Sequence, residues 1–206
     1  MKVVVLDAMG VLYRYGNVQG RVLIPYLRDQ GCDAPEREIR AAYRAATLGL
    51  TSTEEFWAAL GLPPLDADYC RRHTLTDGTI ETLRAVAGAG LEPACLSNDT
   101  AAWSALVRRR FGLERLIGRW FISSDLRARK PDAAPYAAVL DALGVAPAEV
   151  VFVDDRPVNL APARALGMRT ILFQSDDTGA HPDAGQRPDH HVTSMPELAE
   201  ALRRAR

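Results

Sequence analysis

The sequence has 206 residues, of which 48% are hydrophobic and 25% are charged, a composition typical of a globular protein with a substantial core. Its net charge of −1 excludes bulk electrostatic attraction as the basis of its function, so we expect neither a nucleic-acid partner nor a membrane partner. The apolar runs are far shorter than the roughly 20 residues that span a bilayer, and no secretory signal is visible, which predicts a cytoplasmic protein.

Short apolar runs bounded by turn residues recur along the chain and predict buried β-strands. They lie at residues 3–6, 91–96, 120–123, 150–153 and 170–173, with a weaker run around residues 191–192. From the second run onward, stretches with helical spacing of apolar residues separate them. This alternation predicts an α/β fold with a doubly wound parallel sheet.

Residues 14–78 interrupt the alternation, because they contain four helical patterns and no convincing strand. Ser52 and Glu55 have the spacing of a capping box at the start of the third pattern. We therefore expect a core domain of residues 1–13 and 79–206 and a small all-helical domain of residues 14–78. The segment 176–187, with its Asp, Gly and Pro residues, predicts a surface loop.

Polar residues follow the predicted strands at the points where the strands end. Ligands of parallel α/β sheets bind beyond the carboxyl ends of the strands, so these side chains are expected to converge on one edge of the sheet. They are Asp7 after the first strand, Ser97 and Asn98 after the second, Lys130 in the loop after the third, and Asp154 and Asp155 after the fourth.

The convergence of Asp7, Asp154 and Asp155 predicts a cation site, because three crowded carboxylates are costly unless a positive charge neutralises them. Hard carboxylate oxygens without His or Cys favour Mg²⁺. A magnesium ion near Lys130 and the Ser97 hydroxyl suits a phosphoryl group, whose charge and oxygens these groups would bind. Asp7 is the best placed nucleophile, because the following Gly10 allows a sharp turn.

At this point the sequence resembles the haloacid dehalogenase-like (HAD) hydrolases. The resemblance rests on four motifs in the order of that family and covers the whole predicted core. The motifs are residues 3–11, which end in Asp7-Ala8-Met9-Gly10-Val11, then Leu96-Ser97-Asn98, Arg129-Lys130-Pro131-Asp132, and residues 153–159, which begin Val153-Asp154-Asp155-Arg156.

The resemblance implies a nucleophilic Asp7, a charge-balancing and catalytic Lys130, and substrate contacts from Ser97 and Asn98. It also implies Mg²⁺ held by Asp7, the carbonyl oxygen of Met9 and the pair Asp154 and Asp155. The helical insert is similar to the small cap that the family carries after its first motif. The fold that it implies is a HAD-like doubly wound sheet with a small helical cap.

One position departs from the phosphatases of this family, which have a second aspartate two residues after the nucleophile. That aspartate protonates the leaving oxygen and later activates water, whereas this chain has Met9. A thioether has no proton to donate. General acid or base catalysis is worth about 10² to 10⁴ in rate, so its loss would weaken turnover of alkyl phosphates without abolishing nucleophilic attack.

Several neighbouring residues have alternative interpretations. Tyr13 and Tyr15 follow the first motif and either pack at a hinge or supply the missing proton. Asn159 is expected to cap the helix after the fourth motif. A second anionic group of a substrate is within reach of three arginines of the insert and its edge, which are Arg14, Arg40 and Arg44.

Three functions follow from these residues. The leading one is a Mg²⁺-dependent phosphohydrolase that acts on a small phosphorylated metabolite through an aspartyl-phosphate on Asp7. The second is a haloacid dehalogenase, in which Asp7 attacks carbon and halide departs without an acid. The third is a domain that binds phosphate and metal without turnover, which the replacement at Met9 motivates.

Overall fold

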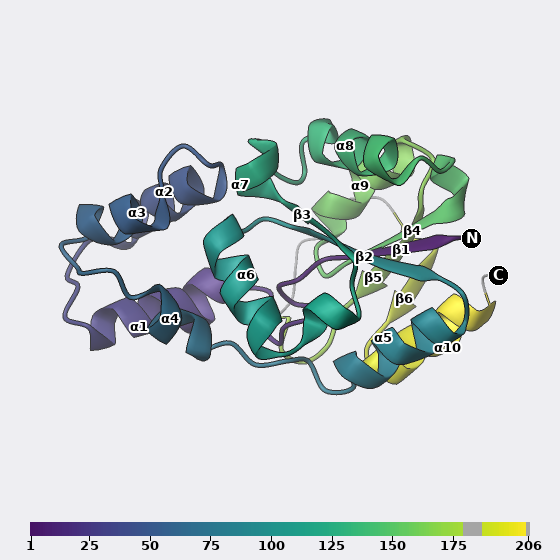
Figure 1. The fold of residues 1–206 in the computed structure, drawn as a ribbon, viewed down its shortest axis with the longest axis horizontal. Coiled ribbons are helices and arrows are strands. Elements are labelled where there is room, and N and C mark those ends of the chain that lie inside the picture. The colour runs from purple at the N-terminus through teal and green to yellow at the C-terminus, as the bar shows by residue number, and fades with distance from the viewer. Residues whose placement is uncertain (179–186, 205–206) are drawn as a thin grey trace.

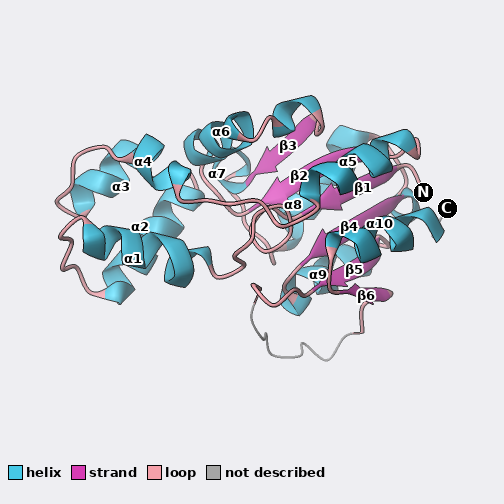
Figure 2. Cartoon of the chain, turned by 90° about the horizontal axis from the view of Figure 1, so that it is seen from below, coloured by secondary structure: helices cyan, strands magenta, loops and turns pink. Residues whose placement is uncertain are grey.

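The computed structural model describes residues 1–178 and 187–204, which form an α/β fold around one six-stranded parallel sheet (Figures 1 and 2). The strands lie in the order β3-β2-β1-β4-β5-β6, and each predicted run forms a strand whose ends differ from the prediction by at most one residue. They are β1 (Val3–Leu6), β2 (Glu92–Ser97), β3 (Arg119–Ile122), β4 (Val150–Asp154), β5 (Arg169–Phe173) and β6 (His190–Val192).

Helices cover both faces of the sheet, as the alternating pattern predicts. Figure 1 shows α8 and α9 on one side and α5 and α10 on the other. The core helices are α5 (Thr79–Gly88), α6 (Ala101–Arg110), α7 (Ser123–Leu126), α8 (Ala133–Leu143), α9 (Pro157–Ala165) and α10 (Met195–Arg204), with short 3-10 helices η2 (Leu113–Arg115) and η3 (Pro147–Glu149).

The central strand β1 is buried on both faces, which fixes the position of the residue that follows it. Val4 and Leu6 pack in the apolar cluster that contains α5, α6 and α10, while Val3 and Val5 pack in the cluster that contains α8 and α9. Full burial of each such side chain stabilises the fold by about 1.5–3 kcal/mol. Because β1 lies between β2 and β4, its carboxyl end is the topological switch point where α/β sheets bind ligands.

The chain between β1 and α5 is helical, and its residues, all of which are described, form no strand. It contains the π-helix η1 (Gln19–Leu23) and the helices α1 (Ile24–Asp29), α2 (Glu36–Thr47), α3 (Thr53–Ala59) and α4 (Asp66–Arg71). These helices gather at one end of the molecule (Figure 1). The capping box of α3 is confirmed, because Ser52 Oγ accepts from Glu55 N at 3.0 Å and Glu55 Oε2 accepts from Ser52 N at 2.7 Å.

An aromatic cluster joins this helical insert to the core. Trp103 of the core helix α6 stacks on Tyr43 of α2, with ring centroids 6.1 Å apart. The same indole meets Phe56 and Tyr69 of the insert edge to face, at 5.2 and 5.0 Å. Such pairs add about 0.5–1.5 kcal/mol each beyond the burial of their area. The insert is therefore anchored to α6, and α2 is held near the ends of the strands.

The expectation that Asn159 caps the helix after β4 is wrong. Helix α9 begins at Pro157, with Arg156 as its N-cap, so Asn159 lies within the first turn. Proline favours the first helical position because its fixed φ is already helical and no N–H is needed there. The side chain of Asn159 instead donates to Asp154 Oδ1 at 2.9 Å, which links it to the site described below.

Two further expectations concern membranes and the loop after β5. None of the described helices is long and apolar enough to cross a bilayer. The predicted surface loop at 176–187 lies mostly outside the described residues, apart from its first three residues and its last one.

Candidate active site

The turn after β1 places Asp7 at the switch point of the sheet. Asp7 N donates to Val153 O of β4 at 2.8 Å, and the chain then folds back so that Tyr13 N reaches Ala8 O at 2.8 Å. Gly10 has a φ of +85°, and a Cβ on it would lie 2.6 Å from the carboxyl group of Asp155. Only glycine fits this turn without strain, so Gly10 lets the backbone wrap closely around the acidic side chains.

Lys130 binds two of the predicted aspartates. Its Nζ lies 2.8 Å from Asp7 Oδ1 and 2.7 Å from Asp154 Oδ2, and all three side chains are buried. The other oxygen of Asp154 accepts from Arg156 N and from Asn159 Nδ2, each at 2.9 Å. These hydrogen bonds hold the Asp154 carboxylate in place, so Asp154 is a fixed counter-ion of the Lys130 ammonium group.

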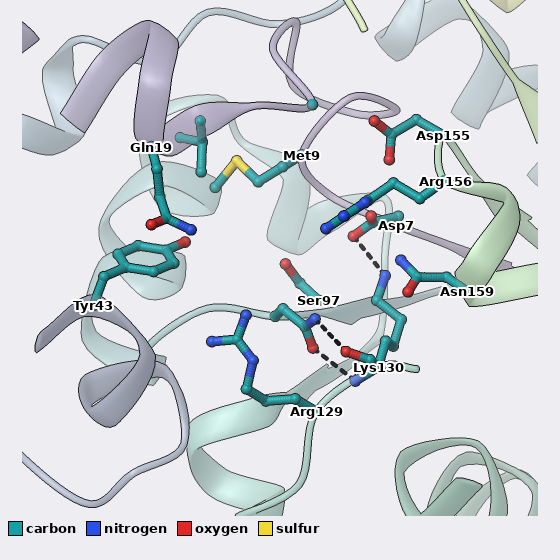
Figure 3. Close-up of a pocket in the computed structure, with 13 residues that line it drawn as sticks. Asp7, Met9, Gln19, Tyr43, Ser97, Arg129, Lys130, Asp155, Arg156 and Asn159 are labelled. Carbon is teal, nitrogen blue, oxygen red and sulfur yellow. Dashed lines mark hydrogen bonds and ion pairs between the residues drawn. The ribbon is translucent and has the colours of Figure 1, made fainter. Parts of the chain in front are cut away.

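The second oxygen of the nucleophile candidate faces a different environment. Asp7 Oδ1 accepts from Ala8 N at 2.6 Å as well as from Lys130, whereas Oδ2 has no hydrogen-bond partner among the described residues. Asp7 lines the pocket shown in Figure 3, where its carboxyl group lies beside the Lys130 ammonium group. One oxygen is thus held in place while the other remains available for chemistry.

Burial and charge crowding perturb both members of this pair. Burial raises the pKa of Asp7 well above its usual range, and repulsion from Asp154 and Asp155 adds to this effect, while Lys130 opposes it. Burial alone would lower the pKa of Lys130, but attraction to Asp154 and Asp7 outweighs it and raises the pKa above its usual value. The carboxylates of Asp154 and Asp7 therefore favour the charged form of Lys130.

The acidic residues have the composition and spacing of a metal site. One oxygen from each of Asp7, Asp154 and Asp155 lies within 4.8 Å of the others, and all three residues are buried. Hard oxygen donors without a thiolate or imidazole suit Mg²⁺. A divalent cation would also relieve the repulsion that raises the pKa of Asp7. The residues present therefore fit a magnesium ion.

The two residues after β2 have different surroundings. Ser97 Oγ is buried without a hydrogen-bond partner in the described part of the chain, and Ser97 lines the pocket. The Asn98 side chain instead binds both sides of the Lys130 backbone: its Oδ1 accepts from Lys130 N and its Nδ2 donates to Lys130 O, each at 2.9 Å. Ser97 is thus open to a ligand, while the Asn98 amide holds the loop that carries Lys130.

Met9 lines the same pocket, and its thioether lies on the side of Gln19 (Figure 3). Tyr13 does not line this pocket: its hydroxyl is buried, and its ring packs on His73 and Phe111. Tyr15 also lies outside the pocket, beneath the guanidinium of Arg21. Of the two interpretations of these tyrosines, packing is the one that fits their surroundings.

Six residues of the pocket were not predicted as site residues. They are Gly16, Val18, Gln19, Tyr43, Arg129 and Arg156, and Asn159, which was expected only as a helix cap, lines the pocket too. The two arginines had a signal, because each lies within a motif, beside Lys130 or Asp155. None of the three arginines named as candidates for a second anion lines the pocket. Arg14 pairs with Asp77 and Asp177, Arg40 pairs with Glu36, and Arg44 lies near Arg129.

Comparison with known proteins places the chain in a family. Residues 1–167 match the family described as haloacid dehalogenase-like hydrolase, and the protein belongs to this family. Phosphoglycolate phosphatase 1 of Pseudomonas aeruginosa is 29% identical over 149 residues, which cover 70% of this chain and 54% of that protein. The chain spans about half the length of the curated relatives it matches.

Solved structures agree with this assignment at the level of the fold. The L-2-haloacid dehalogenase of Xanthobacter autotrophicus, with chloropropionic acid covalently bound, has a TM-score of 0.71 and 20% identity, and the match covers 98% of both chains. A HAD family enzyme of Bacteroides thetaiotaomicron, in complex with magnesium and inorganic phosphate, has a TM-score of 0.72 and 20% identity over 91% of this chain and 96% of that one. The expected HAD-like fold is confirmed.

Proposed function

We propose that the protein is a Mg²⁺-dependent phosphohydrolase that acts on a small phosphorylated metabolite through an aspartyl-phosphate on Asp7. The observation that carries the proposal is the environment of the Asp7 carboxylate, which lines the pocket. Its Oδ1 accepts from Lys130 and from Ala8 N, whereas its Oδ2 is open to the pocket. The relationship to phosphoglycolate phosphatase 1 and the fold of a magnesium and phosphate complex support it.

In the proposed reaction, Asp7 Oδ2 attacks phosphorus and the bond to the leaving oxygen breaks, with its electron pair staying on that oxygen. Lys130 and the unpartnered hydroxyl of Ser97 bind the phosphoryl oxygens. Water then hydrolyses the acyl phosphate, which releases inorganic phosphate and restores the carboxylate. Asp7, Asp154, Asp155 and the Met9 carbonyl would hold a magnesium ion, which would neutralise charge on the phosphoryl group.

Residues 14–78 serve as the cap of this enzyme in our proposal. Gln19 of η1 and Tyr43 of α2 line the pocket opposite the strand ends, so the insert supplies part of the wall that a substrate would touch. Residues 1–13 and 79–206 form the core that carries the chemistry. The cap then selects the substrate, while the core provides the nucleophile.

Substitution of the nucleophile tests the proposal. We expect Asp7→Asn to abolish release of inorganic phosphate in the presence of Mg²⁺, because an amide oxygen is a poor nucleophile. The exposed Asp33→Asn is the matched control and should keep the parental rate. Trapping and mass spectrometry should find a phosphorylated Asp7 in the parent. Absence of turnover by both the parent and Met9→Asp across a broad panel of phosphates would reject the proposal.

Haloacid dehalogenation is the second candidate, and the apolar Met9 side chain in the pocket is the observation that favours it. Here Asp7 would attack the carbon that carries the halogen, the carbon–halogen bond would break with its electrons on the halide, and water would hydrolyse the ester. No proton donor is needed for the leaving halide. Halide release from a 2-haloacid that persists in the presence of a chelator would favour this reaction over phosphate hydrolysis.

A binding domain without turnover is the remaining alternative. It predicts tight binding of inorganic phosphate in the presence of Mg²⁺, with no aspartyl-phosphate under any condition. Trapping of the intermediate therefore separates it from the phosphohydrolase. The open Oδ2 of Asp7 favours the enzyme, because a binding site has no need of an accessible nucleophile beside a fixed ammonium group.

A further inference from the structure

We propose that Arg129 binds a carboxylate of the substrate, so that the preferred substrates are small phosphorylated carboxylic acids. The inference rests on the proposed function for the phosphoryl end of the substrate and extends it to the other end. Nothing in the sequence motifs gives Arg129 this role, since Lys130 next to it is the residue that the motif identifies.

The Arg129 guanidinium is fixed at the junction of core and insert. Its Nη1 donates to Thr47 Oγ1 at the end of α2, and Thr47 Oγ1 in turn donates to Tyr43 O at 2.8 Å. Figure 3 shows the guanidinium and the Tyr43 ring on the side of the pocket away from Asp155. Arg129 therefore projects a rigid cation into the half of the pocket that the insert lines.

This cation has no carboxylate partner among residues 1–178 and 187–204. Its Nε is buried and makes no hydrogen bond there. Burial lowers the pKa of Arg129, and the nearby Arg44 and Arg156 add repulsion. The neighbouring Asp99 is a weak counter-ion, because burial raises its pKa to about 7 and its Oδ1 already accepts from Thr100 N.

A partly buried guanidinium without a carboxylate partner is unfavourable unless an anion binds to it and neutralises its charge. A carboxylate matches the planar fork of arginine with two parallel hydrogen bonds, which gives both energy and geometry. The phosphoryl group has its own donors in Lys130 and Ser97 at the strand ends. The second anion of the substrate is therefore the group that Arg129 fits, and Arg156 adds positive charge to the same pocket.

The test compares two substrates of the same size. 2-Phosphoglycolate and ethyl phosphate share the phosphoester and differ in whether a carboxylate or a methyl group ends the chain. We expect kcat/KM of the parent to favour 2-phosphoglycolate by about 10-fold or more, since a charge-assisted bidentate pair is worth that much. Arg129→Met should bring this ratio close to one, mainly through KM for 2-phosphoglycolate, and Arg129→Lys should keep part of it.

The control is Arg127→Met, which removes an exposed cation of the same loop that does not line the pocket. It should keep the parental ratio, and thermal unfolding of each variant verifies that it is folded. The inference is overturned if the parent does not discriminate or if Arg129→Met keeps the ratio. An equal fall in kcat/KM for both substrates in Arg129→Met also overturns it. That result would mean that Arg129 binds the phosphoryl group or stabilises the fold.

Calorimetric binding of the same two compounds separates this inference from the proposed function. If the parent turns over neither compound but binds 2-phosphoglycolate more tightly in an Arg129-dependent way, the carboxylate site stands, and the broad panel of phosphates decides the phosphohydrolase proposal. If both compounds are hydrolysed equally well, the phosphohydrolase stands and the carboxylate site fails. If neither is bound nor hydrolysed, the carboxylate site fails, and the broad panel of phosphates decides the phosphohydrolase proposal.

Discussion

Lys130 is the residue whose contacts connect most of the site. Its ammonium group lies between Asp7 and Asp154 and over the ring of Phe152 at 5.4 Å, while the Asn98 amide binds its backbone on both sides. These contacts leave the cation little freedom, which favours electrostatic stabilisation without reorganisation during the reaction. Asp154 and Asn98 thus act through Lys130 by positioning it.

Met9 is the residue where a gain of function is expected. Met9→Asp would place a carboxyl group in the wall of the pocket, where we expect it to protonate the leaving oxygen of an alkyl phosphate. We expect kcat/KM for ethyl phosphate to rise by about 10-fold or more, with a smaller change for acetyl phosphate, whose leaving group needs no proton. Steady-state release of phosphate from the two compounds measures the effect.

Met9→Asn is the matched variant for this experiment, because it has the shape of aspartate without a titratable proton. It should show no selective gain on ethyl phosphate. An equal gain in both variants would mean that polarity or space, and not proton transfer, limits the parent. No gain in either would mean that the pocket holds position 9 too far from the leaving group.

At the scale of residues, the sequence was sufficient to predict the position of a site residue where that residue lies at the end of a strand. Asp7, Ser97, Asp154 and Asp155 were predicted to converge because parallel strands end at one edge, and the structure brings them together. The use of the Asn98 amide on the Lys130 backbone depends on a side-chain torsion and a loop conformation, which periodicity does not contain.

Two glycines let the backbone pack closely against the carboxyl group of Asp155. Gly10 belongs to the turn after β1, and Gly16 belongs to the segment that leads into η1. A Cβ on Gly16 would lie 2.0 Å from Asp155 Oδ2, so the backbone of this segment forms a wall of the acidic cluster. The beginning of the insert therefore helps to set the position of a proposed metal ligand.

Gly16→Ala tests this role of the segment. The added methyl group must displace the Asp155 carboxylate, and we expect the affinity for Mg²⁺ to fall by about 10-fold, in the range found when groups that orient metal ligands are changed. Titration of Mg²⁺ by calorimetry, or of the phosphatase rate against Mg²⁺, measures it. Unchanged Mg²⁺ affinity would mean that Asp155 is not a ligand or that it shifts without cost.

Gly88→Ala is the control for this change. Gly88 is the last residue of α5, and a Cβ there meets nothing within 4 Å. Because alanine favours the helix more than glycine, the free energy of unfolding should increase by up to about 1 kcal/mol while the Mg²⁺ affinity stays the same. A comparable loss of Mg²⁺ affinity in Gly88→Ala would show that the assay responds to general perturbation.

Among the elements, the strands were the most predictable, because a doubly covered sheet demands continuous apolar runs such as residues 150–153. The capping box of α3 was equally visible from Ser52 and Glu55. The start of α9 was not, because Pro157 and Asn159 both suit a helix N-terminus; the helix begins at Pro157, and the Asn159 side chain binds Asp154. That bond joins the last residue of β4 to the first turn of α9, and it depends on side-chain torsions that periodicity does not contain.

At the scale of the whole molecule, the sheet and the helical insert both line one pocket. The sheet supplies Asp7, Ser97 and Lys130, and the insert supplies Gln19 and Tyr43. The first set follows from topology, which the alternation of elements predicts. The second set depends on how α2 packs against Trp103 of the core, and one sequence does not specify such a contact. The part of the pocket that the strand ends line was therefore more predictable than the part that the insert lines.

The contact between insert and core also makes the stability of the molecule depend on pH. His73 lies after α4, buried against the rings of Tyr13 and Tyr69, and burial lowers the pKa of its imidazole to about 4 from the model-compound value of 6.5. Between these two pH values the unfolded chain binds a proton that the folded protein does not bind. This contribution is fully present above pH 6.5 and is lost as the pH falls toward 4.

We expect the difference in free energy of unfolding between the parent and His73→Gln to grow with pH by up to about 3 kcal/mol between pH 4 and pH 6.5. Denaturant unfolding at a series of pH values measures it. The difference is the right quantity, because Asp99, whose pKa burial raises to about 7, contributes with the opposite sign in both proteins. Parallel profiles would mean that the imidazole titrates alike when folded and unfolded, and that the junction between insert and core does not exclude a charge.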